Sequence, residues 1–494
     1  MRPPARWLAV ALIASGWGGA SLPGSALAAG YFAGSNGARA AGRAGAFAAR
    51  ADDLSAVLLN PAGLARLQGR LVQVGNRFSH DAFSYTREPT LDWGRLDNGV
   101  PPYVQFATVN EAHPFQLLDP LLGFASNLGL PDWGFALVAQ APAGIARREF
   151  PTDGGQRYMM VSREAVILSY SASAAWRHRD TFGVGVTLQW IHVPRLSYAL
   201  VIDANQFPAQ VNPVSSELDM LARVTGSDPF TFNAILGAWY RPLPFLEVAA
   251  SGQLIPAQIK TRSRLSVSPL SPEIHDPVVL RRDGALADDV SVTLPLPLTA
   301  RLAVRYLHLR GGREVFDLEL DLGYESWSRV KRFTVDGNGL TGNLLAQRLD
   351  VGLIEVDKQW RDTFSLHLGG DFAALPGRLT VRGGGFYESA VARRRTAHVD
   401  FPSGAQLGGA LGGSVFVHGI ELAFAYEYRF QPRVRVGEGE AGVYQEVPGS
   451  QCQPPYLDSN TCHPQYLGQR APAVNAGSYS ATSQVASVEI LYRF

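Results

Sequence analysis

Residues 420–430 read IELAFAYEYRF, and large apolar side chains alternate with smaller or charged ones along this stretch. Ile420 begins the apolar set, which continues at every second position, whereas the intervening positions begin with Glu421 and carry Ala, Ala, Glu and Arg. Because successive side chains of a strand point to opposite faces, a repeat of two predicts a strand with one apolar face. The pattern recurs at 181–190, 316–325 and 486–494, so the chain is predicted to be all-β.

The connections between these segments alternate in length. Short, turn-forming connections lie at 177–180, 241–244, 310–313, 376–377 and 418–419. Long polar connections lie at 146–163, 203–228, 266–290, 335–360, 391–405 and 431–482. Short turns at one end and long loops at the other are typical of outer-membrane β-barrels, whose sheet must close because an open edge cannot be satisfied in hydrocarbon.

The pattern predicts a 14-stranded antiparallel transmembrane β-barrel over residues 70–494, in keeping with the even strand number of bacterial barrels. The predicted strands are 70–86, 102–110, 133–145, 164–176, 181–200, 229–240, 245–265, 291–309, 314–334, 361–373, 378–390, 406–417, 419–430 and 483–494. The connection 111–132 is long for a periplasmic turn, and its paired leucines suggest a short helix or a different register for the early strands.

The N-terminus has the parts of a secretory signal peptide over residues 1–28. Arg2 and Arg6 form a basic region, an apolar segment follows, and Ala26-Leu27-Ala28 gives the small-x-small cleavage pattern. Only two cysteines occur, Cys452 and Cys462, and in an exported chain they are predicted to form a disulfide that closes a loop.

Composition and motifs give no reason to propose an enzyme, a cofactor, a metal site or a nucleic-acid partner. The formal net charge is +1, with 44 basic against 43 acidic residues, and so it offers no excess charge for nucleic acid. The ten histidines are scattered without an HExxH pattern, and neither a GxSxG elbow nor a phosphate-binding glycine loop is present.

Residues 29–69 lack the strand pattern and are rich in Ala and Gly, with turn residues at Asn60, Pro61, Ala62 and Gly63. A barrel of 14 strands has a lumen wider than wall side chains can fill. We therefore predict that this segment is a hatch that plugs the lumen; the alternative is a periplasmic tail.

Charged residues are expected to face the lumen on two neighbouring strands. Arg301 and Arg305 lie on one strand, and the next carries Asp317, Glu319, Asp321 and Glu325 at alternate positions. An interstrand ladder of internal ion pairs is the favoured interpretation, and a polar conduit or head-group site is the alternative.

The third predicted strand is interrupted by Pro142, Ala143 and Gly144, directly after an alternating run that ends at Gln140. Proline removes a ladder donor and glycine weakens pairing, so either a bulge with an inward kink forms here or the strand ends at Gln140.

Three pieces of the N-terminal segment, in this order, resemble the hatch of the FadL/TodX family. They are residues 37–47 (GARAAGRAGAF), 51–53 (ADD) and 60–64 (NPAGL). Weaker similarities lie at 324–328 (YESWS), 360–363 (WRDT) and 492–494 (YRF). Members of this family are outer-membrane transporters of long-chain fatty acids and other hydrophobic compounds. In this chain Leu58-Leu59 precede Asn60 where the family commonly has an aromatic residue.

The resemblance implies passive transport by a monomer in the outer membrane of a Gram-negative bacterium. Loops 203–228 and 266–290 would capture a fatty acid or a hydrocarbon, and Tyr31 and Phe32 would contact it in an internal pocket. The ligand would then leave sideways into the lipid through a gap at the kinked third strand. Implied partners are the ligand, outer-membrane lipid and the barrel-assembly machinery. The alternatives are a water-filled porin for small polar solutes and an outer-membrane hydrolase.

Overall fold

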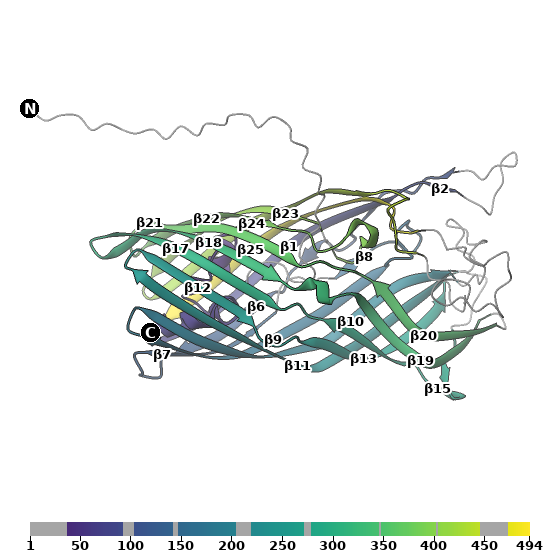
Figure 1. Cartoon of the computed structure of the whole chain (residues 1–494), viewed down its shortest axis with the longest axis horizontal. Helices are drawn as coiled ribbons and strands as arrows, with labels where there is room; N and C mark the ends of the chain where they lie inside the picture. The colour runs from purple at the N-terminus through teal and green to yellow at the C-terminus, as the bar shows by residue number, and fades with distance from the viewer. Residues whose placement is uncertain are drawn as a thin grey trace, which may run out of the picture.

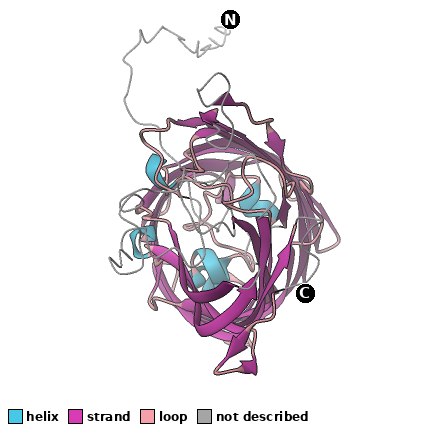
Figure 2. Ribbon diagram, turned by 90° about the vertical axis from the view of Figure 1, so that its right-hand side faces the viewer, coloured by secondary structure: helices cyan, strands magenta, loops and turns pink. Residues whose placement is uncertain are grey.

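The computed structural model describes residues 37–91, 103–141, 147–203, 219–270, 278–344, 347–401, 404–444 and 473–494. Their strands form a closed 14-stranded antiparallel barrel, as the sequence predicts (Figures 1 and 2). Several sequence predictions lie outside the described residues: the segment 1–28, Tyr31, Phe32, Pro142, Ala143, Gly144, Cys452 and Cys462.

Short helices fall into two regions of the chain. The N-terminal region contains α1 (Ala38–Ala41), α2 (Ala56–Leu59) and the 3-10 helix η1 (Pro61–Arg66), and two further 3-10 helices lie in connections, η3 (Trp327–Arg329) and η4 (Arg394–Thr396).

The first half of the barrel contains the following strands: β1 (Arg70–Arg87), β4 (Val109–Asn110), β5 (Phe115–Gln116), β6 (Pro120–Ser126), β7 (Trp133–Gln140), β8 (Arg148–Glu149), β9 (Ser162–His178), β10 (Phe182–Asp203), β11 (Asp219–Leu243), β12 (Leu246–Gln253) and β13 (Gln258–Pro269). The small strands β2 (Thr90–Leu91) and β3 (Tyr103–Val104) pair with each other in a separate sheet.

The second half contains β14 (Arg281–Arg282), β15 (Ala285–Leu286), β16 (Asp289–Pro295), β17 (Thr299–Arg310), β18 (Arg313–Glu325), β19 (Arg332–Leu344), β20 (Gln347–Asp357), β21 (Thr363–Leu375), β22 (Leu379–Glu388), β23 (Gln406–Val417), β24 (Ile420–Val436) and β25 (Gly477–Arg493). The barrel closes where β25 pairs antiparallel with β1 along their full lengths.

The tight turns at one end of the barrel are those that the sequence predicts. Gly311 (φ 59°) and Gly312 (φ 73°) connect β17 to β18, and His418 (φ 49°) and Gly419 (φ 81°) connect β23 to β24. Two consecutive residues of positive φ give the turn whose twist matches that of the flanking strands. These turns therefore fix the register of the hairpins.

The barrel is inverted relative to a soluble domain, with apolar side chains outside. On β18, Leu318 is 50% exposed, whereas its neighbour Glu319 is 0% exposed and faces the lumen. A sheet with an apolar outer face and a polar inner face suits a lipid surround. None of the helices in the described part of the chain is long and apolar enough to cross a membrane.

The predicted second strand, 102–110, ends too early, because only its last two residues, in β4, pair with β1. The barrel strand next to β1 is formed by β4, β5 and mainly β6, so the expected turn or helix at 111–132 contains a strand. Its alternation is hidden because both faces are apolar: Leu121 (2% exposed) packs on the N-terminal segment, and Leu122 (54% exposed) faces outward.

Three predicted long strands are interrupted. Pro256 separates β12 from β13, Pro297 lies between β16 and β17, and Ser326 follows β18 before η3. Proline cannot donate to the ladder, which accounts for the first two interruptions. The region 335–360, expected to be a loop, continues the sheet as the β19–β20 hairpin, and β10 and β24 also extend beyond their predicted ends.

Candidate functional site

The N-terminal segment 37–69, called the hatch segment below, lies inside the barrel near the end that carries the tight turns (Figure 1). Its α1 packs on β23, β24 and β25, whereas η1 packs on β7, β9, β10 and β11. Almost every hatch residue from Ala38 to Ala65 is buried. The hatch segment therefore crosses the lumen from one wall to the other.

Asn60 connects the hatch segment to itself and to the wall. Its Nδ2 donates to the Ala48 carbonyl oxygen (2.9 Å) and to that of Ala238 on β11 (3.2 Å), and its Oδ1 accepts from the Ala62 amide (3.2 Å). The Trp239 indole then donates to the Ala62 carbonyl oxygen (3.0 Å). The side-chain oxygen of Asn60 caps η1, and its NH2 group remains free to donate to the two carbonyl oxygens.

Two wall glycines permit this close approach. A Cβ at Gly237 would lie 2.1 Å from Oδ1 of Asn60, and one at Gly185 would lie 2.5 Å from the carbonyl carbon of Pro61. Any side chain at either position would push the Asn60–Gly63 turn away from the wall. The wall and the hatch motif are thus fitted to each other at the level of single atoms.

Arg43 joins the hatch segment to the opposite wall. Its guanidinium is fully buried and lies 2.8 Å from Asp317, 2.9 Å from Glu319 and 2.9 Å from Asp371. The wall carboxylates also accept from the hatch backbone: Asp321 from the amides of Phe47 and Ala48, and Glu319 from that of Ala49. A buried cation needs such partners, because desolvation costs several kcal/mol per ion.

A second set of ion pairs holds the start of the hatch segment. Arg39 lies 2.8 Å from Asp52 and 3.3 Å from Glu421 of β24, and the Ala38 amide donates to Glu489 of β25 (3.1 Å). Burial alone would raise the pKa of Asp52, but the guanidiniums of Arg39 and Arg50 outweigh it and hold that pKa well below its ordinary value. Asp52 is therefore charged at neutral pH and holds Arg39 in place.

Among the described residues, the predicted interstrand ladder is reduced to one of its pairs, Arg305 with Asp317. The main partners of the other lumen carboxylates, Glu319 and Asp321, belong to the hatch segment. Sequence reasoning missed the remaining anchors, Asp371, Glu247, Glu421 and Glu489, and their hatch partners. An arginine-rich hatch opposite acidic residues at lumen-facing strand positions was the signal that could have identified them.

A cavity of about 130 Å³ lies beside the hatch segment. Ala44, Gly45, Leu58 and Leu59 of the hatch segment form one side. The other side mixes apolar wall residues with polar ones, among them Ile191, Ile235, Leu296, Gln189, Asn233 and Arg301. The cavity is thus amphipathic and is bounded on one side by the hatch segment.

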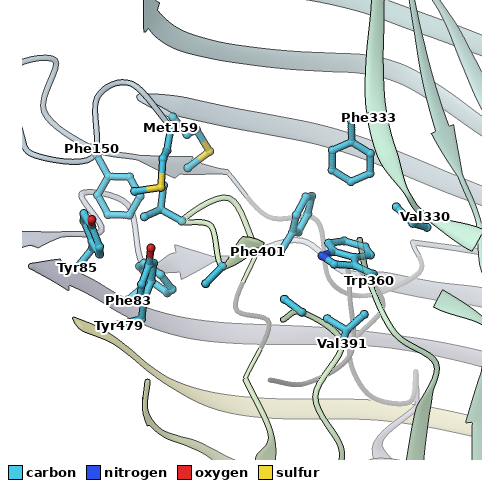
Figure 3. Close-up of a cluster of buried hydrophobic side chains, with 14 of the residues drawn as sticks. Phe83, Tyr85, Phe150, Met159, Val330, Phe333, Trp360, Val391, Phe401 and Tyr479 are labelled. Carbon is cyan, nitrogen blue, oxygen red and sulfur yellow. The ribbon is translucent and has the colours of Figure 1, made fainter. Parts of the chain in front are cut away.

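A cluster of buried apolar side chains lies in the half of the barrel farther from the tight turns. Figure 3 shows part of this cluster. Two connections supply many of its members, 150–161 (Phe150, Met159) and 389–401 (Val391, Phe401). The connection between β20 and β21 adds Trp360, and the walls add Tyr85 and Tyr479 among others.

Lys358 is fully buried beside this cluster, with its ammonium over the Phe333 ring. The same ammonium lies 2.5 Å from one carboxylate oxygen of Asp400, and the other oxygen lies 2.9 Å from Nδ1 of His398. Burial lowers the pKa of His398, although Asp400 offsets part of the effect.

The wall is irregular at the third barrel strand. β7 pairs with β9 as far as Gln140 opposite Ser169, and pairing resumes in β8 with Arg148 opposite Arg163. The chain has more residues between Gln140 and Arg148 than β9 has between Arg163 and Ser169, so the two pairings differ in register. A cavity of about 240 Å³ lies here, lined by residues of β1, β5, β9, β24 and β25 and by Ala141 and Arg147. Many of its lining side chains are charged, among them Arg77, Asp81, Glu111, Asp119, Arg148 and Arg163.

The predicted site residues thus divide into two groups. The four motif residues lie together in the hatch segment and pack against the barrel wall: Asn60, Pro61, Ala62 and Gly63. The predicted pocket and kink residues lie outside the described residues, as do loop segments 204–218 and 271–277. Within the described ranges, no group of three or more His, Cys, Asp or Glu side chains is placed to hold a metal ion.

A closed barrel with an apolar outer face, whose lumen holds its own N-terminal segment, defines a plugged barrel of the outer membrane. The family described as outer membrane protein transport protein (OMPP1/FadL/TodX) matches residues 19–442. The chain therefore belongs to this family of outer-membrane transporters for hydrophobic and aromatic compounds.

Solved structures share the fold. A FadL homologue from Pseudomonas aeruginosa superposes with a TM-score of 0.71 at 16% identity, covering 94% of this chain and 100% of that chain. The toluene transporter TodX of P. putida gives 0.62 at 14% identity, covering 93% and 99%. The CymD monoaromatic hydrocarbon channel gives 0.59 at 14% identity, covering 93% and 98%. No curated protein sequence matches the chain significantly.

Proposed function

We propose that this protein moves hydrophobic small molecules passively across the outer membrane and releases them sideways into the lipid. Residues 1–28 would be a signal peptide, 29–69 the hatch domain and 70–494 the barrel. The observation that supports the proposal is the combination of an occupied lumen with a cavity where the pairing of the third strand with β9 changes register. A route straight down the axis meets the hatch segment, whereas an opening in the wall at this position would offer another exit.

Sideways release suits an apolar ligand on physical grounds. Moving apolar surface out of water is favourable by about 25 cal/mol per Å², so lipid is a better destination than an aqueous channel. A cavity of about 150 Å³ accommodates benzene where its lining is apolar. The cavity of about 240 Å³ beside β9 exceeds that volume, but charged residues such as Arg77, Asp119 and Arg163 line much of it. The proposal therefore rests on the position of this cavity and not on a dry apolar site.

The substrate class includes long-chain fatty acids and aromatic hydrocarbons. The toluene transporter TodX and the monoaromatic channel CymD share the fold and support the aromatic member of this class. The occupied lumen favours a transporter over a water-filled porin. As expected from the sequence, the protein would act as a monomer, and the barrel-assembly machinery would insert it.

Substitution of Ala165 by Trp tests the exit. Ala165 lies on β9 and lines the cavity at the wall break, so the indole fills part of that space. We expect A165W to bind a fluorescent fatty acid in detergent as the parent does, but to transfer it into proteoliposomes at least about fivefold more slowly. The matched control is Ala139→Trp on β7, which does not line the cavity. Equal transfer rates for A165W and the parent would contradict release at this break.

A further inference from the structure

A row of basic side chains lies on the outer surface of the barrel, on β13. Lys260, Arg262 and Arg264 are exposed, whereas the intervening Ile259, Thr261, Ser263 and Leu265 are buried toward the barrel interior. Side chains two apart on a strand share a face and lie about 7 Å apart. The three cations, called the basic row below, therefore form a line that points away from the barrel.

The basic row is not neutralised by its own surroundings. Among the described residues, Lys260, Arg262 and Arg264 have no ion pair and no side-chain hydrogen bond. Asp289 of β16 stands opposite Arg264 in the ladder, but its carboxylate pairs with Arg282 at 2.5 Å. The exposed Asp288 lies alongside, with its carbonyl accepting from the Leu265 amide.

A fourth cation extends the surface onto the neighbouring strand. Arg223 of β11 lies opposite Ser266, one alternate position beyond Arg264, and it too has no ion pair within the described ranges. The residues of β11 that face Arg264 and Arg262 are Thr225 and Ser227, which carry no charge. Cations thus outnumber nearby acids over two adjacent strands.

The basic row begins where the apolar belt ends. Asp228 of β11 accepts from the Lys260 amide (2.9 Å) and from the amide of Phe230 (3.0 Å), which fixes these two residues at the same height. Phe230 is exposed, as are Phe232, Leu236 and Tyr240 farther along β11 toward the tight turns. Aromatic residues of this kind mark the boundary of the hydrocarbon region.

From this placement we propose that the basic row binds the phosphate groups of the glycolipid in the outer leaflet, the lipid A part of lipopolysaccharide. The row lies at head-group height on the side opposite the tight turns, where an outer-membrane protein meets that leaflet. Arginine forks match phosphate oxygens in pairs, and a lysine adds a point charge. The acyl chains of the same molecule would cover the apolar belt beneath.

The test measures binding of diphosphoryl lipid A to the full-length protein in detergent, by native mass spectrometry and by the shift in melting temperature. The variant K260Q/R262Q/R264Q removes the row. The matched control R310Q/R313Q/R378Q removes three exposed cations from the tight-turn end of the barrel. Heat-dependent gel mobility shows whether each barrel is folded, and R262Q alone serves if the triple variant does not fold.

We expect the row variant to bind diphosphoryl lipid A about tenfold or more weakly, since each cation near an anionic surface contributes substantially. The control should bind like the parent, and added salt should weaken parent binding by screening. Monophosphoryl lipid A should bind more weakly than the diphosphoryl form, and millimolar inorganic phosphate should not displace it. Equal binding by row and control variants, or no dependence on lipid phosphate, would overturn the proposal.

Discussion

The contact between Asn60 and the wall shows how single atoms decide the position of the hatch segment. Its amide caps η1 and bonds to β11, and only the absence of a side chain at Gly237 leaves room for it. Adding a methyl group to a tightly packed site typically costs about 1–3 kcal/mol. The neighbouring residues shift to relieve part of this strain. We therefore expect the hatch motif to be sensitive to one methyl group on the wall.

Substitution of Gly237 by Ala tests this contact. The new methyl group would meet Oδ1 of Asn60, so we expect the hatch segment to move and single-channel recordings in planar bilayers to show openings that the parent lacks. Gly409→Ala on β23 is the control, because its nearest neighbour for a Cβ is 3.7 Å away. If G237A shows no more channel openings than the parent, the proposed contact between Gly237 and Asn60 is wrong.

The second prediction at the residue scale concerns the ion pairs of Arg43. Replacing Arg43 with Gln leaves Glu319 without an ion pair among the described residues, whereas Asp317 and Asp371 keep Arg50. Breaking a buried ion pair costs about 3–5 kcal/mol. Hydrogen exchange should report a loss of protection of about a hundredfold at the amides of Phe47 and Ala48. The exposed Arg310→Gln is the control; unchanged protection in R43Q would show that the pairs do not hold the hatch.

At the scale of elements, sequence patterning predicts strands well where their two faces differ. Glu319 and Leu318 differ in polarity, so β18 is evident, whereas β6 has apolar residues on both faces and was missed. The tight turns were also predictable, because glycine pairs such as Gly311-Gly312 require positive φ. The hatch anchors were not, because pairs such as Arg43–Asp371 join residues far apart in sequence, and only closure of the barrel brings them together.

The inward connection 389–401 should respond to pH through His398. Burial lowers the pKa of this imidazole below its ordinary 6.5. Below pH 6.5, His398 therefore binds more protons when the connection 389–401 is unfolded than when it is packed in the barrel. The packing contribution of His398 is therefore present above pH 6.5 and is lost as pH falls toward its lowered pKa. Asp400 stays charged, because His398 and Lys358 outweigh burial and hold its pKa well below its ordinary value.

We expect hydrogen exchange, corrected for its intrinsic pH dependence, to show weaker protection of Val399 and Phe401 at pH 5 than at pH 7.5. His398→Gln cannot titrate and should lose this difference. Protection that is equal at both pH values in the parent, or a difference that persists in H398Q, would assign the connection's stability to other groups.

At the scale of the whole molecule, the barrel combines an occupied lumen with an irregular wall. The hatch segment joins opposite walls, the apolar cluster of Figure 3 lies beyond it, and the pairing of the third strand with β9 changes register between β7 and β8. Under the proposed function, a molecule that enters this barrel would meet these apolar side chains and would leave where the third strand changes register. The proposal therefore expects the barrel to exclude small polar solutes and to accept apolar ones.

The most direct test of that claim compares two measurements on purified protein in liposomes: swelling driven by a small sugar, and saturable binding and transfer of a fluorescent long-chain fatty acid or a labelled monoaromatic hydrocarbon. The account predicts saturable transfer of the hydrophobic ligand without swelling. Swelling without saturable transfer would contradict it and would identify the barrel as an open porin.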